Sequence, residues 1–130
     1  MDYLVNKKNM TEEDIKLRFI TPAITSKWDL HNQIRMEYNF TDGRVIVRGN
    51  SVRRGKRKKA DYVLFYKRNI PLAIVEAKDN NHSVGSGMQQ AIDYAEILDI
   101  PFAYSSNGDA FLERDMKNGM IKMVNLLQKA

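Results

Sequence analysis

The chain has 130 residues, with 21 Lys and Arg, 16 Asp and Glu and no cysteine, and its formal net charge is +5. This length suits one globular domain, and the missing cysteine excludes disulfides and thiolate metal sites and agrees with a cytoplasmic protein. No apolar run approaches the ~20 residues of a membrane-spanning helix, and the N-terminus lacks the apolar core of a secretory signal. We therefore expect a single domain over residues 1–130, in the cytoplasm and without membrane contact.

The basic residues are concentrated in residues 44–59, which hold eight Lys and Arg and no acid, so that the rest of the chain is net acidic. Such a cluster favours a polyanion as partner, because Lys and Arg displace counterions from phosphates. A solvated loop without a partner is the alternative. The residues expected to contact nucleic-acid phosphates are Arg53, Arg54, Lys56, Arg57, Lys58 and Lys59.

Two helical pieces are predicted near the N-terminus. Thr11 is a good N-cap, and Asp14 three residues later completes a capping-box pattern. Apolar residues follow at helical spacing, and Thr21-Pro22 is typical of a second N-cap followed by proline at the first helical position. The predicted elements are a loose lead-in over 1–10 and helices over 11–20 and 21–29, or one helix kinked at Pro22.

A hairpin followed by a basic loop is predicted next. Residues 33–40 and 44–48 are strand-like, and Thr41-Asp42-Gly43 between them is a strong turn signal. The stretch 49–59, with its two glycines, has the composition of a loop.

The second half of the chain alternates strands with one helix. Residues 61–66 and 72–78 are rich in Val, Ile, Leu and aromatic residues, as strands are. The further predicted elements are a polar loop over 79–87, a helix over 87–99 with Ser86 as candidate N-cap, strands over 101–105 and 110–114, and a strand or short helix over 120–129. This order predicts an α/β fold with a central mixed sheet flanked by helices.

The strongest functional signal lies at the end of the strand over 72–78. Because side chains alternate between faces, Glu76 and Lys78 share a face, and both faces of the strand are apolar before them. If the turn to the preceding strand is centred between residues 68 and 69, Asp61 lies directly opposite Glu76, with Cβ atoms about 5 Å apart. The sequence therefore predicts two adjacent carboxylates beside a core.

Two carboxylates this close are destabilising unless one is protonated or a cation lies between them. Mg²⁺ fits, since it binds one or two carboxylates together with waters and phosphate oxygens. Lys78 could then orient or deprotonate a water. The plainer alternative is a strand-starting Asp61 and an exposed Glu76–Lys78 ion pair.

Supporting groups are predicted on two helices. Gln90 and Tyr94 are four residues apart and share a helix face, so Gln90 could bond the lysine or a metal-bound water. Glu12 and Glu13 lie in the first helical turn, where the helix dipole favours acids in any case. Periodicity does not separate these two glutamates.

These residues resemble a known family. Asp61 followed by Glu76-Ala77-Lys78 resembles the PD-(D/E)xK nuclease motif, and Gln90 with Tyr94 resembles the QxxxY motif of RecB-like nucleases. More specifically, the chain resembles the N-terminal nuclease domain of the restriction (R) subunit of type I restriction-modification enzymes. The matching segments are 11–14, 20–23, 41–44, 59–64, 71–78, 89–95 and 106–108.

The resemblance implies roles for the site residues. Asp61 and Glu76, with the Ala77 carbonyl, would bind Mg²⁺, or Mn²⁺ in its place. Glu12 becomes the preferred glutamate and would support the metal site. The catalytic residues expected from the resemblance are Asp61, Glu76, Lys78, Gln90, Tyr94 and Glu12.

The resemblance also implies a larger assembly. Such a domain precedes ATP-dependent motor domains in a longer polypeptide that works with methylation and specificity subunits, so that ATP binding would belong to the motor. We therefore expect either an excised fragment or a free-standing relative that hydrolyses phosphodiester bonds of double-stranded DNA. The alternatives are a non-catalytic DNA-binding module that uses the basic loop over 53–59 and a metal-free protein-interaction domain.

Overall fold

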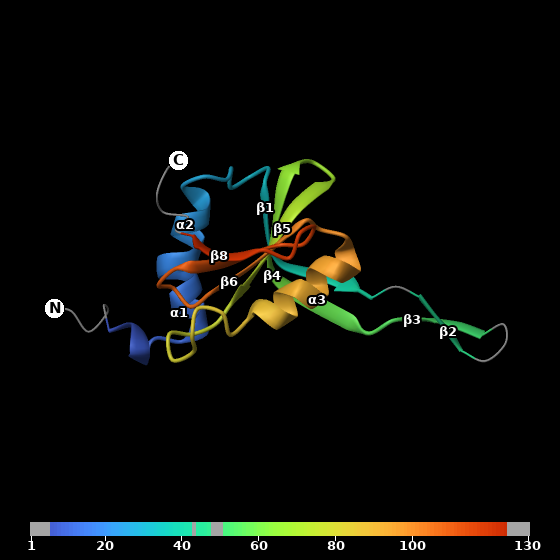
Figure 1. Cartoon of the computed structure of the whole chain (residues 1–130), viewed down its shortest axis with the longest axis horizontal. Helices are drawn as coiled ribbons and strands as arrows, with labels where there is room; N and C mark the ends of the chain where they lie inside the picture. Colours follow the sequence, from blue (N-terminus) through green and yellow to red (C-terminus); the bar gives the residue numbers. More distant parts are fainter. Residues whose placement is uncertain (1–5, 43, 48–50, 125–130) are drawn as a thin grey trace.

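The computed structural model describes residues 6–42, 44–47 and 51–124 (Figure 1). The helical elements are the 3-10 turn η2 (Lys7–Asn9), helix α1 (Glu12–Ile15), the π-helical turn η3 (Lys16–Ile20), α2 (Thr21–Thr25) and α3 (Met88–Leu98). The strands are β1 (Ile34–Thr41), β2 (Arg44–Val47), β3 (Ser51–Arg54), β4 (Arg57–Lys67), β5 (Ile70–Ala77), β6 (Phe102–Ser106), β7 (Phe111–Asp115) and β8 (Ile121–Val124). None of the described helices is long and apolar enough to span a membrane.

Six strands form one sheet in the order β1-β4-β5-β6-β7-β8. Strands β5 and β6 run parallel and are joined through α3, whereas the other described neighbours in this sheet are antiparallel. The predicted mixed sheet flanked by helices is therefore confirmed. The last predicted element is a strand in its described part, β8, and residues 125–130 lie outside the described residues.

The N-terminal helical segment is continuous, and one of its two predicted caps is wrong. The capping box at Thr11 is confirmed, because Thr11 Oγ1 accepts from Asp14 N at 3.1 Å and Asp14 Oδ2 accepts from Thr11 N at 3.3 Å. Thr21 is not a cap: its backbone is helical, its N–H donates to the Lys16 carbonyl in a π turn, and its hydroxyl lies 2.7 Å from the Tyr62 hydroxyl. The Thr21 side chain, which the local sequence predicted to cap a helix, instead contacts Tyr62 of the sheet.

The lead-in is also more ordered than predicted over its described residues, 6–10. Lys8 Nζ donates to the Asn80 carbonyl at 2.6 Å, and Lys7 Nζ donates to Asp109 Oδ1 at 2.9 Å. Met10 is buried in the core. These long-range contacts fix a segment whose own composition carries no signal for order.

The predicted hairpin between residues 33–40 and 44–48 is wrong. Strand β1 pairs with β4, with Thr41 opposite Arg57, and β2 pairs instead with β3, with Arg44 opposite Arg54. Figure 1 shows β2 and β3 extending away from the six-stranded sheet as an arm, named here the β2–β3 arm. The basic stretch 49–59 is consequently not one loop, since it contributes β3 and the start of β4; positions 43 and 48–50 lie outside the described residues.

The hairpin of β4 and β5 has the predicted register where the site lies. Tyr62 pairs with Val75 and Val63 with Ile74, which places Asp61 beside Glu76. The register shifts near Phe65, closer to the turn. The shift therefore leaves the carboxylate end of the hairpin unaffected.

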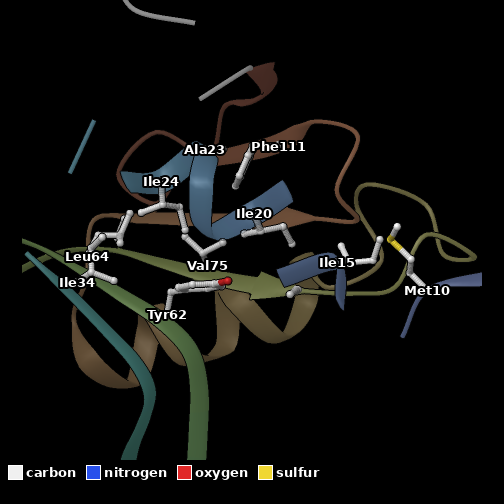
Figure 2. Close-up of a cluster of buried hydrophobic side chains, with 12 residues drawn as sticks. Met10, Ile15, Ile20, Ala23, Ile24, Ile34, Tyr62, Leu64, Val75 and Phe111 are labelled. Carbon is white, nitrogen blue, oxygen red and sulfur yellow. The ribbon is translucent and has the colours of Figure 1, made fainter. Parts of the chain in front are cut away.

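Both faces of the sheet are covered, as expected for a buried central strand. Figure 2 shows Ile20 and Ile24 of the helical segment over Val75 and Tyr62 of the sheet, with Ile15 beside Met10. On the other face, α3 packs on a second cluster. We call these the N-terminal face and the α3 face. The buried residues of the α3 face are Ala60, Val63, Ile74, Met88, Ala91, Ala95, Ile100 and Ala103.

Helix α3 begins at a glycine and not at the predicted serine cap. Gly87 is the N-cap, and Ser86 Oγ bonds to Ser83 Oγ instead. A Cβ on Gly87 would lie 3.1 Å from Ser105 Oγ and 3.3 Å from Glu76 Cβ. The absence of a side chain therefore lets the start of α3 approach the end of β5, where Glu76 lies.

Candidate active site

Asp61 and Glu76 are adjacent and locked together by the backbone of the hairpin. Glu76 Oε2 accepts a hydrogen bond from Asp61 N at 3.0 Å, and Asp61 Oδ2 accepts one from Ala77 N at 2.8 Å. Glu76 is 3% exposed, and the Asp61 side chain is 15% exposed. Each carboxylate is thus held by the strand that carries the other, which fixes both on the rim of a buried strand pair.

The electrostatics of this pair favour a bound proton or cation. Burial, followed by the negative charge of Asp61, raises the pKa of Glu76 to about 7, although hydrogen bonds from Asp61 N and Gln90 act in the opposite direction. The Lys16 ammonium lies 3.7 Å from Asp61 Oδ1 and offsets part of this negative charge, and a further positive charge would stabilise the pair. A hard cation with oxygen ligands would supply it.

The donor set fits a magnesium ion better than a transition metal. Among the described residues no group of three or more His, Cys, Asp or Glu side chains is arranged to hold a metal. Mg²⁺ needs fewer, because it keeps several waters and takes one or two carboxylates with substrate phosphate oxygens. Ala77 ends β5, and its N–H bonds Asp61, so its carbonyl is a candidate for an additional oxygen of the type Mg²⁺ prefers.

Gln90 and Tyr94 are on the same face of α3, as predicted, and both lie near Glu76. Gln90 Nε2 donates to Glu76 Oε1 at 2.7 Å, so it bonds the carboxylate and not the lysine. The Tyr94 ring packs edge to face against the Phe40 ring, with 5.0 Å between the ring centres. Burial, then the charge of Glu76, raises the pKa of Tyr94, which keeps its hydroxyl protonated.

The structure separates the two N-terminal glutamates. Glu12 is half-buried, and burial and then the Asp61 charge raise its pKa, so it faces the carboxylate pair. The Glu13 side chain is 80% exposed. Glu12 is therefore the glutamate that the fold brings to the site.

Lys78 is half-buried at the end of β5, where its backbone N–H donates to the Ser106 carbonyl at 2.9 Å. The positive charge of Lys78 lowers the pKa of Glu12, so the two side chains are electrostatic neighbours. Its ammonium makes no hydrogen bond or ion pair with any residue in the described part of the chain. The Lys78 ammonium is thus an electrostatic neighbour of Glu12 and has no hydrogen-bond or ion-pair partner among the described residues.

Sequence reasoning missed Lys16 and Glu37. Lys16 is 2% exposed, and its ammonium lies 2.7 Å from Glu37 Oε2 and 3.7 Å from Asp61 Oδ1. Burial alone would lower the pKa of Lys16, but the hydrogen bond to Glu37 and the charge of Asp61 raise it above its usual value. A lysine four residues before the buried Ile20, on the apolar side of a helix, was the signal that could have revealed it.

Known proteins are similar to this chain in sequence and in fold. Residues 41–100, which include the Asp61, Glu76, Lys78, Gln90 and Tyr94 positions, match the model of the second domain of the type I restriction enzyme EcoKI endonuclease subunit. The type I restriction enzyme EcoAI endonuclease subunit of Escherichia coli is 50% identical over 112 residues, which are 85% of this chain and 14% of that protein. The chain is a relative of type I restriction endonuclease subunits.

A solved structure agrees with this relationship. The fragment of a protein assigned as the HsdR subunit of a type I restriction enzyme from Vibrio vulnificus YJ016 is 46% identical, with a TM-score of 0.74 over 88% of this chain and 23% of that chain. The chain therefore corresponds to one region of such a subunit and spans a small part of the length of the relatives it matches.

In this relative of the endonuclease subunits, the predicted phosphate-contacting residues differ in their surroundings. Lys56 and Arg57 are exposed, and Lys58 lies 4.0 Å from Asp42. Lys59 donates to Glu37 at 2.8 Å and so belongs to the network of Lys16 and Asp61. Arg53 and Arg54 are on β3, and their side chains lie outside the described part of the molecule.

Proposed function

We propose that this chain is the Mg²⁺-dependent nuclease module of a type I restriction enzyme and hydrolyses phosphodiester bonds of double-stranded DNA. The observation that supports this most is the Asp61–Glu76 pair, two adjacent carboxylates that the hairpin backbone fixes and that a proton or a cation would stabilise. The pattern of Asp61, Glu76 and Lys78 is that of the PD-(D/E)xK nucleases. The relationship to endonuclease subunits agrees with this assignment.

The chemistry divides among the residues as follows. Asp61, Glu76 and the Ala77 carbonyl would hold Mg²⁺, for which Mn²⁺ could substitute. When bound, the ion polarises the phosphate and lowers the pKa of a water. The Lys78 side chain positions that water as an ammonium, or takes its proton as the neutral amine. Gln90 keeps Glu76 in place through its 2.7 Å hydrogen bond.

Two further residues complete the proposed site. Glu12 adds a third carboxylate on the Asp61 side, where it also balances the charge of Lys78. Tyr94 packs on Phe40 and supports the helix face that presents Gln90. Both are assigned supporting roles, because neither is hydrogen-bonded to the carboxylate pair in the described residues.

The partners proposed for this module are double-stranded DNA and the other components of the restriction enzyme. The basic start of β4, with the β2–β3 arm, would contact the DNA backbone and carry no sequence information. Methylation and specificity subunits would act through the complete assembly, and ATP would be used by motor domains elsewhere in the polypeptide. Cleavage and localisation in the cytoplasm follow from the same proposal.

The decisive experiment is plasmid cleavage by the complete enzyme with Mg²⁺. We expect Asp61→Ala and Lys78→Ala each to lower the cleavage rate by at least about 100-fold, which corresponds to roughly 3 kcal/mol of transition-state stabilisation. Asp109→Ala, a surface carboxylate whose partner is Lys7, serves as the matched control and should cut normally. Cleavage at the wild-type rate by either site variant would refute the assignment.

The rival function is a non-catalytic DNA-binding module, which the exposed Lys56 and Arg57 favour. That module would bind DNA in a salt-sensitive manner, indifferent to Mg²⁺ and to Asp61→Ala. DNA binding that is unaffected by the metal, together with unchanged cleavage in the site variants, would favour it. A metal-free protein-interaction domain would instead show no DNA affinity at low salt.

A further inference from the structure

Two backbone irregularities of the molecule meet at one ion pair. Lys16 opens the π-helical turn η3, and Glu37 in β1 has a left-handed backbone with φ of 52°. Lys16 Nζ donates to Glu37 Oε2 at 2.7 Å. Single π turns are frequent at functional sites, and a left-handed residue with a side chain is unfavourable unless its surroundings impose it.

Glu37 lies at the level of Asp61 in the sheet. The ladder pairs Met36 with Tyr62 and Tyr38 with Ala60, so that Glu37 and Asp61 face each other between these pairs. The left-handed residue Glu37 therefore lies at the position in the β1–β4 pairing that is opposite Asp61, the candidate metal ligand.

The strands change face at this position. Ile34 packs on the N-terminal face, whereas Tyr38, four residues on, packs on the α3 face. In β4 likewise, Tyr62 packs on the N-terminal face and Ala60 on the α3 face. Residues of equal parity would otherwise share a face. The unusual backbone at Glu37 thus accompanies a rotation of both strands beside Asp61.

Lys16 completes the contact from the N-terminal face. Its side chain is 2% exposed, and its ammonium lies 3.5 Å from Glu13 Oε2, 3.7 Å from Asp61 Oδ1 and 5.9 Å from the centre of the Tyr62 ring. A lysine this buried persists when it is paired. Because Ala77 N holds Asp61 Oδ2 at 2.8 Å, the two oxygens of Asp61 are constrained from two sides.

We propose that Lys16 and Glu37 are positioning residues for Asp61. Lys16 sets the direction of Asp61 Oδ1, and Glu37 holds the Lys16 ammonium, with Lys59 steadying Glu37 at 2.8 Å. The inference rests on the proposed metal-binding role of Asp61. The contact of Lys16 with Glu37 and Asp61 would explain both the π turn and the left-handed backbone of Glu37. An apolar contact between the helical segment and the sheet would require neither.

The competing explanation is that the pair joins the helical segment to the sheet and does nothing else. The double variant Lys16→Met/Glu37→Gln separates the two explanations, because it removes one positive and one negative charge and leaves the net charge unchanged. Lys16 is buried, and methionine is an apolar side chain of similar volume, whereas the Glu37 side chain is 41% exposed, so the amide that replaces it can bond water. A change in metal affinity then reports the geometry of Asp61.

The test measures Mn²⁺ binding by electron paramagnetic resonance in the complete endonuclease subunit, with Asp61→Ala giving the background. We expect the double variant to bind Mn²⁺ about 10- to 100-fold more weakly at the Asp61-dependent site, the usual loss when a group that orients a metal ligand is removed. Lys7→Met/Asp109→Asn removes another ion pair, of 2.9 Å, and should bind as the wild type does.

The outcomes separate this inference from the proposed function. Wild-type Mn²⁺ affinity in the folded double variant overturns the positioning role. If Asp61→Ala leaves Mn²⁺ binding of the wild type unchanged, the proposed metal site itself fails. Should the double variant not fold, Glu37→Gln alone, which removes the negative charge that holds the Lys16 ammonium, is expected to weaken binding several-fold. Wild-type affinity there also overturns the role.

Discussion

The middle and the beginning of strand β4 differ in how tightly their charges are held. In the middle, Asp61 and Glu76 each accept a backbone hydrogen bond from the opposite strand, and Gln90 and Lys16 add further contacts. At the beginning, Arg57 is exposed, as is Lys56 immediately before the strand. A few positions along one strand therefore separate a fixed, buried group of charges from a solvated one.

This difference teaches which task each region can perform. A fixed carboxylate pair with little room to relax suits chemistry, which depends on placement to within a fraction of an ångström. Solvated cations suit attraction of a polyanion, which depends on charge and on salt concentration more than on geometry. Lys59 lies between the two, because its ammonium is exposed yet bonded to Glu37.

The largest effect is expected from Glu76→Gln, which removes one carboxylate of the Asp61–Glu76 pair. Cleavage by the complete enzyme should fall at least about 100-fold, since an amide is a poor Mg²⁺ ligand. In the absence of metal, Glu76→Gln should instead increase the free energy of unfolding above neutral pH. Because the pKa of Glu76 is about 7 in the folded chain and 4.5 for an unperturbed glutamate, the wild type loses stability as pH rises through that window.

The measurement is chemical denaturation of the metal-free chain at pH 5 and pH 8. The wild type should lose on the order of 3 kcal/mol between them from this group, at about 1.4 kcal/mol per pKa unit, and Mg²⁺ should restore part of it. Glu76→Gln should lack this loss, and Glu96→Gln, an exposed acid on α3, should behave as the wild type. A variant that loses as much as the wild type would contradict the raised pKa of Glu76.

A smaller effect is expected from removing charge at the beginning of β4. In Lys56→Gln/Arg57→Gln, the slope of log affinity against log salt should decrease by up to about 2, at about 0.9 for each phosphate that is no longer neutralised. The cleavage rate at saturating DNA should be unchanged, because these side chains lie away from the carboxylates. Filter binding at several salt concentrations measures the slope. Lys117→Gln/Lys122→Gln, near β8, is the control, and an equal effect there would argue against a localised DNA contact.

The smallest effect is expected from Thr11→Ala, which should lower the stability of the fold and leave cleavage unchanged. Loss of the capping box should cost about 1 kcal/mol of unfolding free energy, because Asp14 N loses its 3.1 Å acceptor. Cleavage at saturating Mg²⁺ should be retained. Thermal unfolding detects the change, and Thr25→Ala at the other end of the helical segment should cost less. Full loss of cleavage would show that α1 contributes more than support.

Several features of the site could be predicted because they depend on residues close in sequence. The two-residue turn between β4 and β5 sets which residues oppose each other, so the proximity of Asp61 and Glu76 was available from counting. The shared face of Gln90 and Tyr94 follows from helical spacing. The capping box at Thr11 is likewise contained within one turn of helix.

The predictions from sequence were wrong where contacts with residues distant in the chain overrode a local sequence pattern. Thr21 met the Tyr62 hydroxyl and did not cap a helix. The turn signal at residues 41–43 did not form the predicted hairpin, because Tyr38 and Phe40 of β1 pair with β4 and pack against the α3 face. Ser86 was replaced as cap by Gly87, since only glycine allows so close an approach to Glu76 and Ser105.

Strand alternation, a short turn and helical spacing act over a few residues, so the mixed fold, the carboxylate pair and the helix face that holds Gln90 could be predicted without a structure. Only the tertiary structure decided that β1 pairs with β4, that Lys16 is buried and that Glu37 adopts a left-handed backbone. These depend on which segments meet across the sheet. The buried Lys16 ammonium would be unfavourable unpaired, and the Glu37 carboxylate is its partner beside Asp61. The left-handed φ of Glu37 is unfavourable for a residue with a side chain unless its surroundings impose it.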